Sequence, residues 1–189
     1  MVPFRSGLLL FALATCAGAC SPQAPAPERL DHAELADAWE TWRASRDSLF
    51  QSASSPLPLP EVDAFVGLQY FPYDSAAAVS AALVPAMIVD TTLFPTSTGE
   101  LRPMSVAGQL VFDLDGTEWR LMAYQAVGIA GLPSTGLFVP FRDATSGRAT
   151  YGGGRYLDLD GRPDAEGRIV VDFNKAYHPY CVYNETYSC

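Results

Sequence analysis

Residues 104–126 read MSVAGQLVFDLDGTEWRLMAYQA, and this stretch decides the fold class. Two segments rich in β-branched and aromatic residues, Met104–Leu114 and Trp119–Ala126, flank the tetrapeptide Leu114-Asp115-Gly116-Thr117. Asp-Gly tolerates the positive φ angles of a type I′ turn, which joins two antiparallel strands through only two residues. The stretch therefore predicts a β-hairpin.

Six further segments share this composition and are bounded by turn-forming residues. They are Phe65–Phe71, Val79–Val84, Met87–Thr92, Gly136–Phe141, Arg155–Leu159 and Arg168–Phe173. Asp160-Gly161 begins a longer turn that closes near Gly167. No strand–helix–strand alternation occurs, which argues against a parallel nucleotide-binding sheet. We predict a mainly β fold, an antiparallel sandwich or partly closed barrel with one N-terminal amphipathic helix packed on one side or edge.

The predicted helix runs from Asp31 to about Phe50. Its apolar face repeats near a period of 3.6 and comprises Leu35, Trp39, Trp42, Leu49 and Phe50, with Ala36 and Arg46 between them. Asp31 and Glu34 form an Asp-x-x-Glu capping box. The two tryptophans are expected to anchor the helix onto the domain, and the opposite face, with Glu40, Arg43 and Asp47, is expected to be solvated. The Ser- and Pro-rich residues 51–60 are predicted to be a connector, neither helix nor central strand.

The N-terminus has the pattern of an export signal. Arg5 precedes an apolar run, residues 7–14, that is too short to span a bilayer. Ala17-Gly18-Ala19-Cys20 resembles the lipobox of bacterial lipoproteins, and it also fits the A-x-A rule of the general signal peptidase. Both alternatives cleave before Cys20 and differ in whether a lipid is attached. We expect a signal peptide over 1–19, lipidation at Cys20, a flexible tether over 20–30 and one domain over 31–189.

Composition and net charge limit the classes of partner that the protein is expected to bind. The chain has 189 residues, of which 49% are hydrophobic and 17% charged, enough for one globular domain with a core. Its formal net charge of −9 argues against nucleic acid as a partner, because nucleic-acid binders need a basic surface. We therefore expect an exported protein that faces the periplasm or the cell exterior and contacts the membrane through its N-terminal lipid only.

The cysteines support this compartment. After loss of Cys16 with the signal and lipidation of Cys20, Cys181 and Cys189 remain. Two thiols in an oxidising compartment are expected to form a disulfide. Two alternatives stay open: both cysteines are reduced and buried, or Cys181 is a nucleophile assisted by His178, although Pro179 between them argues against a helix that would join them.

Several short motifs are too incomplete to carry chemistry. Gly152-Gly153-Gly154 lacks the rest of either phosphate-loop pattern and more often indicates a bend or a close backbone approach. Asp158-Leu159-Asp160-Gly161 resembles part of a calcium loop but lacks the acidic residues that such a loop needs at 156 and 167. His32 and His178 lie far apart without a zinc-binding context, and no GxSxG motif occurs. The sequence predicts no metal site and no cofactor.

The most informative region spans residues 138–189. It contains the blocks VPFRDATSG (139–147), TYGGGRYLD (150–158), DFN (172–174) and AYHPYC (176–181). This succession closely resembles an uncharacterised bacterial family, domain-of-unknown-function family 1684, over about residues 35–189. The resemblance implies no activity or ligand. It does imply that His178 stands where many relatives have Asn, and that the family pattern continues past Cys189, so that this chain ends before the pattern does.

The same region is dense in groups that are costly to bury without partners. The candidate ligand-binding residues are Arg142, Asp143, Tyr151, Arg155, Asp172, Asn174, Tyr177 and His178. In a structural interpretation, Arg155 pairs with Asp172 or Asp143 and Asn174 satisfies turn backbone. In a functional one, these residues converge in a concave site with aromatic walls.

Two functions are consistent with the sequence. The first is an envelope lipoprotein that binds a small ligand or a protein, or serves envelope maintenance. The alternative is a small hydrolase that uses Asp143, Asp172 or His178 as acid or base near Arg155, within residues 141–181.

Overall fold

The predicted hairpin forms the centre of the sheet. β3 (Leu101–Leu114) and β4 (Thr117–Ala126) pair antiparallel, and the two turn residues Asp115 and Gly116 have φ angles of 54° and 73°. These angles are those of a type I′ turn, as the sequence predicted. The structure is a computed structural model in which residues 30–88, 90–128 and 134–189 are described.

A β-bulge bends the longest strand. The register of β3 against β4 shifts between Val106 and Gly108, and Gly108 has a φ of 152°. A side chain at Gly108 would collide with the backbone of Val84, so glycine allows β1 (Ala78–Pro85) to approach β3 here. On the other half of the same edge, β3 pairs with β2 (Thr91–Pro95).

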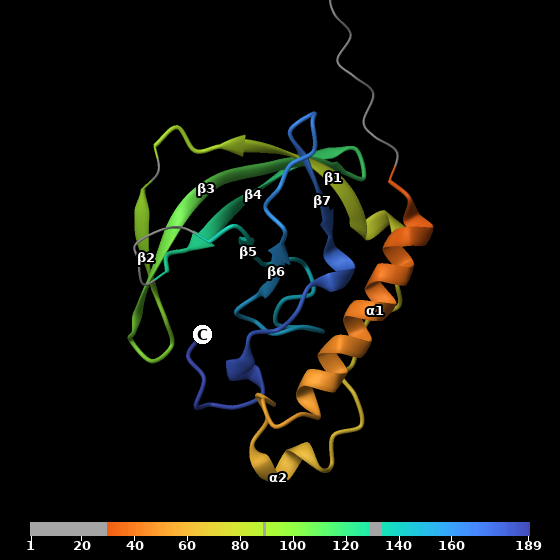
Figure 1. Ribbon diagram of the computed structural model, residues 1–189, viewed down its shortest axis with the longest axis vertical. Helices are drawn as coiled ribbons and strands as arrows, with labels where there is room; N and C mark the ends of the chain where they lie inside the picture. The colour runs from red at the N-terminus through yellow and green to blue at the C-terminus, as the bar shows by residue number, and fades with distance from the viewer. Residues whose placement is uncertain (1–29, 89, 129–133) are drawn as a thin grey trace, which may run out of the picture.

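All pairings between the named strands are antiparallel, and the sheet curls into a partly closed barrel (Figure 1). The order is β6-β5-β4-β3-β1-β7, where β5 is Leu137–Phe141, β6 is Arg155–Leu159 and β7 is Arg168–Asp172. The two ends of this order approach each other, since Tyr156 in β6 forms a bridge with Tyr177, which follows β7. The predicted fold class is confirmed.

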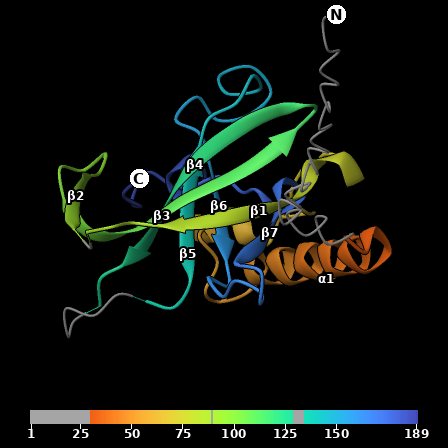
Figure 2. The same cartoon turned by 90° about the horizontal axis from the view of Figure 1, so that it is seen from above.

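One long helix lies along the open side of the sheet. Helix α1 (His32–Phe50) is capped by Asp31, whose carboxylate accepts hydrogen bonds from the N–H groups of Ala33 and Glu34. Figures 1 and 2 both show α1 beside β7. Trp39 is buried and its indole N–H donates to the carbonyl of Asn174 at 3.2 Å, so this tryptophan anchors the helix as predicted.

The remaining helices are single turns: α2 (Leu59–Val62), η1 (Ser75–Ala77), η2 (Phe173–Lys175) and η3 (Tyr180–Val182). The main core lies on the concave side of the sheet and contains Ala81, Leu110, Phe112, Ala123, Leu137, Val139, Leu157, Ile169 and Val171. It draws on six of the seven strands, which explains why side chains far apart in sequence meet there.

Residues 65–71, predicted to be a strand, are irregular in the structure. The N–H of Leu68 donates to the carboxylate of Asp47 at 3.1 Å, and the Tyr70 hydroxyl donates to the same carboxylate at 3.0 Å. The segment thus packs on α1 instead of joining a neighbouring strand. The helix face with Arg43 and Asp47, predicted to be solvated, is therefore partly covered by this segment: Asp47 accepts the two hydrogen bonds above, and Arg43 stacks on the ring of Tyr70.

Several boundaries differ from prediction: β3 and β4 begin three and two residues earlier than predicted, and two segments differ more. The strand predicted at 87–92 corresponds to β2, which begins at Thr91. The bounds of β2 are set by its pairing with residues 101–105 of β3, and Met87 and Ile88 before it are exposed. Within the connector 51–60, helix α2 begins at Leu59. Pro60 is tolerated there because the first turn of a helix needs no N–H from it.

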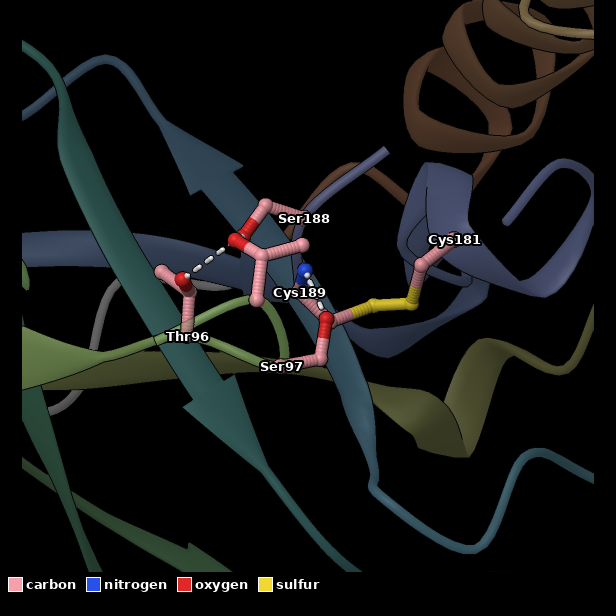
Figure 3. Close-up of a disulfide and its surroundings, with 6 residues drawn as sticks. Thr96, Ser97, Cys181, Ser188 and Cys189 are labelled. Carbon is pink, nitrogen blue, oxygen red and sulfur yellow. Dashed lines mark hydrogen bonds between the residues drawn. A yellow bond between two sulfur atoms is a disulfide. The ribbon is translucent and has the colours of Figure 1, made fainter. Parts of the chain in front are cut away.

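The C-terminal segment is fastened at two points. Cys181 and Cys189 are joined in the structure, with Cα atoms 5.7 Å apart, within the usual range for a disulfide (Figure 3). The backbone of Cys189 also bonds to Ser97 in the β2–β3 turn, through its N–H at 3.0 Å and its carbonyl at 2.7 Å. Because Cys181 is joined to Cys189, it has no free thiol, and the disulfide accounts for the residue without a role as a nucleophile.

Within the described ranges, no helix is both long and apolar enough to cross a membrane. The predicted signal peptide, the lipidation site Cys20 and nearly all of the tether lie outside the described residues.

Candidate functional site

A cavity of about 1160 Å³ opens between α1 and the curled sheet. Its walls come from α1, the irregular segment 68–77, the β3–β4 turn end, the loop from β5 to β6 and the segment that follows β7. Aromatic side chains dominate: Trp42, Tyr70, Phe71, Tyr73, Phe112, Trp119, Phe141, Phe173, Tyr177 and Tyr183. Trp119 is 53% exposed, which is unusual for the largest apolar side chain and leaves its ring available to a ligand.

The structure brings six of the eight candidate residues to this cavity: Arg142, Asp143, Arg155, Asn174, Tyr177 and His178. The other two, Tyr151 and Asp172, do not line the cavity but each contacts a residue that does. The N–H of Tyr151 donates to Nε2 of His178 at 3.3 Å, and Asp172 is buried beside Asn174.

Asp143 and Arg155 form an ion pair at the end of β5. Nη2 of Arg155 donates to Oδ2 of Asp143 at 2.6 Å, and the Arg155 side chain is only 13% exposed. The other carboxylate oxygen accepts from the N–H and the hydroxyl of Thr145, at 2.9 and 2.5 Å. Burial raises the pKa of Asp143, but the bonds from Thr145 and Arg155 outweigh it, so the pKa lies below its usual value. Of the two predicted partners of Arg155, Asp143 is the one in contact.

Asn174 ties the segment around Asp74 to the end of β7. Its Oδ1 accepts from the N–H of Asp74 at 2.9 Å, and its Nδ2 donates to the Asp74 carbonyl at 2.8 Å and to Oδ1 of Asp172 at 2.7 Å. The structure thus supports the structural interpretation of this residue. Asp172 has a second oxygen, Oδ2, that is buried without a hydrogen-bond partner, as is the nearby Tyr73 hydroxyl.

His178 lies half-buried in a positively charged part of the cavity. Burial, followed by the charges of Arg155 and Arg46, lowers the pKa of His178 below its usual value. The ring is therefore neutral at pH 7, and Nε2 is the acceptor nitrogen because it faces the N–H of Tyr151.

Arg46 is a lining residue that the sequence did not single out for function. Its guanidinium lies 4.5 Å from the ring centroid of Tyr177, 5.3 Å from that of Trp42 and 5.8 Å from that of Phe50. Nε and Nη2 of Arg46 are buried and make no hydrogen bond. The sequence feature that could have identified Arg46 is its position within the apolar face of the predicted helix, where a charged side chain is unexpected.

Tyr177 marks the boundary of the site. Its hydroxyl donates to Asp158 at 2.6 Å, and burial together with this bond raises the pKa of Tyr177. Tyr177 and Arg46 line both the main cavity and a second one of about 720 Å³, which the C-terminal Cys189 also borders.

The short motifs have structural roles. Gly154 has a φ of 108°, and a side chain there would press on the carbonyl of Phe141, in agreement with the predicted close backbone approach. Asp158 accepts from Tyr177, as above. In the described part of the chain, no group of three or more His, Cys, Asp or Glu side chains is placed to hold a metal ion.

Among the other lining residues that the sequence analysis missed, Tyr70 and Phe71 lie in the segment predicted as a strand, and Tyr73 lies just after it. No local pattern distinguishes aromatic residues that line a cavity from those that fill a sheet, so only the tertiary contacts reveal them.

Comparison with known proteins identifies the family. An uncharacterised protein of Haloarcula marismortui, known from a solution NMR structure, is 37% identical, with a TM-score of 0.63. The match covers 82% of this chain and 86% of that chain, so it extends beyond the 63–189 region toward the N-terminus. No curated protein matches the chain. The family described as "Protein of unknown function (DUF1684)" matches residues 63–189, two thirds of the sequence, and the chain belongs to this family.

Proposed function

We propose that this protein is a small-ligand-binding module of the cell envelope, held at the membrane by a lipid on Cys20. The observation that carries the binding proposal is the cavity of about 1160 Å³, which combines aromatic walls with a few convergent polar side chains. Ligand sites usually have this composition and a volume of roughly 300–1,000 Å³, and this cavity is slightly larger.

Binding is favoured over hydrolysis by the state of the candidate acids and bases. Both oxygens of Asp143 are occupied by Thr145 and Arg155, and its lowered pKa makes it a weak base. The acceptor nitrogen of His178 faces a backbone N–H. These groups are arranged to hold the loop and the cavity wall in place.

The location in the envelope is supported by the signal-like N-terminus and by the joined cysteines, since disulfides persist in oxidising compartments. We predict that Cys20→Ser releases the protein from membranes into a soluble form. Fractionation and mass spectrometry of the N-terminus check this. Wild-type protein that is soluble and carries no acyl chain would contradict the lipid anchor.

A thermal-shift screen tests the binding proposal, because any ligand that binds the folded state raises the Tm. The panel consists of small aromatic and aliphatic acids, amines and alcohols. Trp119→Ala removes an exposed ring from the cavity, and Leu93→Ala is the matched control, since Leu93 is 54% exposed and lies on β2 outside the cavity. We expect a class of compounds to raise the Tm of the wild type and of Leu93→Ala but not of Trp119→Ala. No shift, or equal shifts in all three proteins, would refute the proposal.

A further inference from the structure

We propose that the ligand of the cavity is an organic anion with a ring-bearing apolar body, and that Arg46 receives its anionic group. This inference rests on the proposed binding function and names the chemical class of the ligand.

The first observation is that the Arg46 guanidinium contacts aromatic rings but has no ion-pair partner among the described residues. Nε and Nη2 are buried without a hydrogen bond, and among the described residues no carboxylate lies within ion-pair distance of its guanidinium. Buried charges normally have a partner, because desolvation of an isolated ion is expensive. Nη1 is the guanidinium nitrogen that is not among these buried atoms, and since Arg46 lines the cavity, we assign Nη1 to the ligand.

Burial together with the lack of an ion pair sets Arg46 apart from its neighbours. Among the described residues, Arg142 also lines the cavity without an ion pair, but its side chain is exposed, whereas that of Arg46 is partly buried. Arg155 bonds to Asp143 at 2.6 Å, and Arg43, one turn before Arg46 on α1, lies 3.8 Å from Glu40. Arg43 also does not line the cavity.

The second observation is the charge distribution around the site. The chain as a whole has a net charge of −9, yet the arginines 46 and 155 both act on His178 with positive charge. Of the three acids that line the cavity, Asp143 binds Arg155 and Asp74 caps η1, while Asp115 lies exposed in the β3–β4 turn. The three arginines and three aspartates that line the cavity balance in formal charge, so the positive charge is local to the part of the cavity around Arg46, Arg155 and His178. An anion is attracted to that part and not to the cavity as a whole.

The third observation concerns the apolar part of the ligand. The rings of Trp42 and Tyr177 flank the guanidinium at 5.3 and 4.5 Å, and both line the cavity. Phe112, Phe141 and Phe173 continue this apolar surface, with ring centroids 5.3–5.6 Å apart. A molecule whose carboxylate or phosphate reaches Arg46 therefore meets flat aromatic surfaces with the rest of its body, and a ring stacks on these favourably.

The test uses three probes that share one ring system and differ in charge: 2-naphthoate, 2-naphthalenemethanol and 2-naphthylmethylammonium. Binding to the full chain is measured by calorimetry and by quenching of tryptophan fluorescence, since Trp42 and Trp119 line the cavity. One charge-assisted hydrogen bond is worth about tenfold or more in affinity. We expect 2-naphthoate to bind about tenfold or more tightly than the alcohol, and the ammonium probe to bind most weakly.

The decisive variants are Arg46→Met and Arg43→Met. Arg46→Met is expected to abolish the preference for the acid while the alcohol binds as before, and Arg43→Met is expected to leave the preference intact. Replacement of an unpaired buried charge by an apolar side chain does not destabilise a fold in general, and unchanged circular dichroism verifies this here. Arg46→Lys, which keeps the charge, retains a preference for the acid.

The outcomes separate the two proposals. If the alcohol binds as well as the acid, or if the preference survives in Arg46→Met, the anion inference is wrong while the binding function stands. If none of the probes binds and the thermal-shift screen is also negative, both are wrong.

Discussion

Replacing Asn174 by alanine should destabilise the fold more than its partial exposure suggests. The side chain makes three hydrogen bonds: two to the backbone of Asp74, which lies 100 residues away in sequence, and one to Asp172, two residues away. Asn174→Ala removes all of them, and with them the attachment of the cavity-lining segment 68–77 to the end of β7.

The magnitude follows from the surroundings of each bond. A typical net hydrogen bond contributes about 1 kcal/mol to stability, and groups that remain accessible recover part of this by binding water. The two bonds to Asp74 are solvent-exposed, whereas the bond to Asp172 is partly buried. We therefore expect a loss of about 2.5 kcal/mol in the free energy of unfolding. For a chain of this size, that corresponds to a Tm lowered by about 5–10 °C.

Urea unfolding followed by tryptophan fluorescence measures this loss, because Trp39 bonds to the carbonyl of residue 174 and reports on the same junction. Asn184→Ala is the matched control. The Asn184 side chain accepts only from the backbone and hydroxyl of Thr186, two residues away and exposed, so its removal should cost less than about 1 kcal/mol. Equal losses for the two variants would show that the long-range bonds of Asn174 do not hold the junction together.

Two further predictions concern the C-terminal disulfide and the ion pair between Asp143 and Arg155. Replacing both Cys181 and Cys189 by serine opens a loop of nine residues and should lower the free energy of unfolding by roughly 2.5 kcal/mol. Urea denaturation measures this loss. An unchanged free energy of unfolding, or two alkylated thiols in the non-reduced wild type, would contradict the disulfide. Because its pKa is lowered in the folded state, Asp143 contributes stability that is fully present above its unfolded pKa of about 3.9 and is lost as the pH falls through the folded value. Asp143→Asn should therefore be less stable than the wild type at pH 7, and the two should converge as the pH falls through the folded pKa of Asp143. A difference between the two stability curves that stays constant during acidification would refute the role of the ion pair with Arg155.

Local features of the fold could be predicted because they depend on residues adjacent in the chain. The Asp115-Gly116 turn needs positive φ at two successive positions, and the cap at Asp31 needs a carboxylate within reach of the next backbone N–H groups. The period of apolar residues then assigns helix or strand. Where these signals conflict with pairing, as at 65–71, the prediction fails, because aromatic residues suit a helix-packed segment as well as a strand.

For the site, the sequence by itself determined that polar and aromatic residues are concentrated within 141–178, and this region supplies less than half of the residues that line the cavity. Only the tertiary structure decided which of them are paired. Asp143, rather than Asp172, binds Arg155, and Arg46, more than 90 residues away from that pair, enters the same cavity without a partner. The reason is physical: turn and helix propensities act over a few residues, whereas burial, ion pairing and cavity shape depend on contacts that exist only after the sheet has curled and α1 has packed against it.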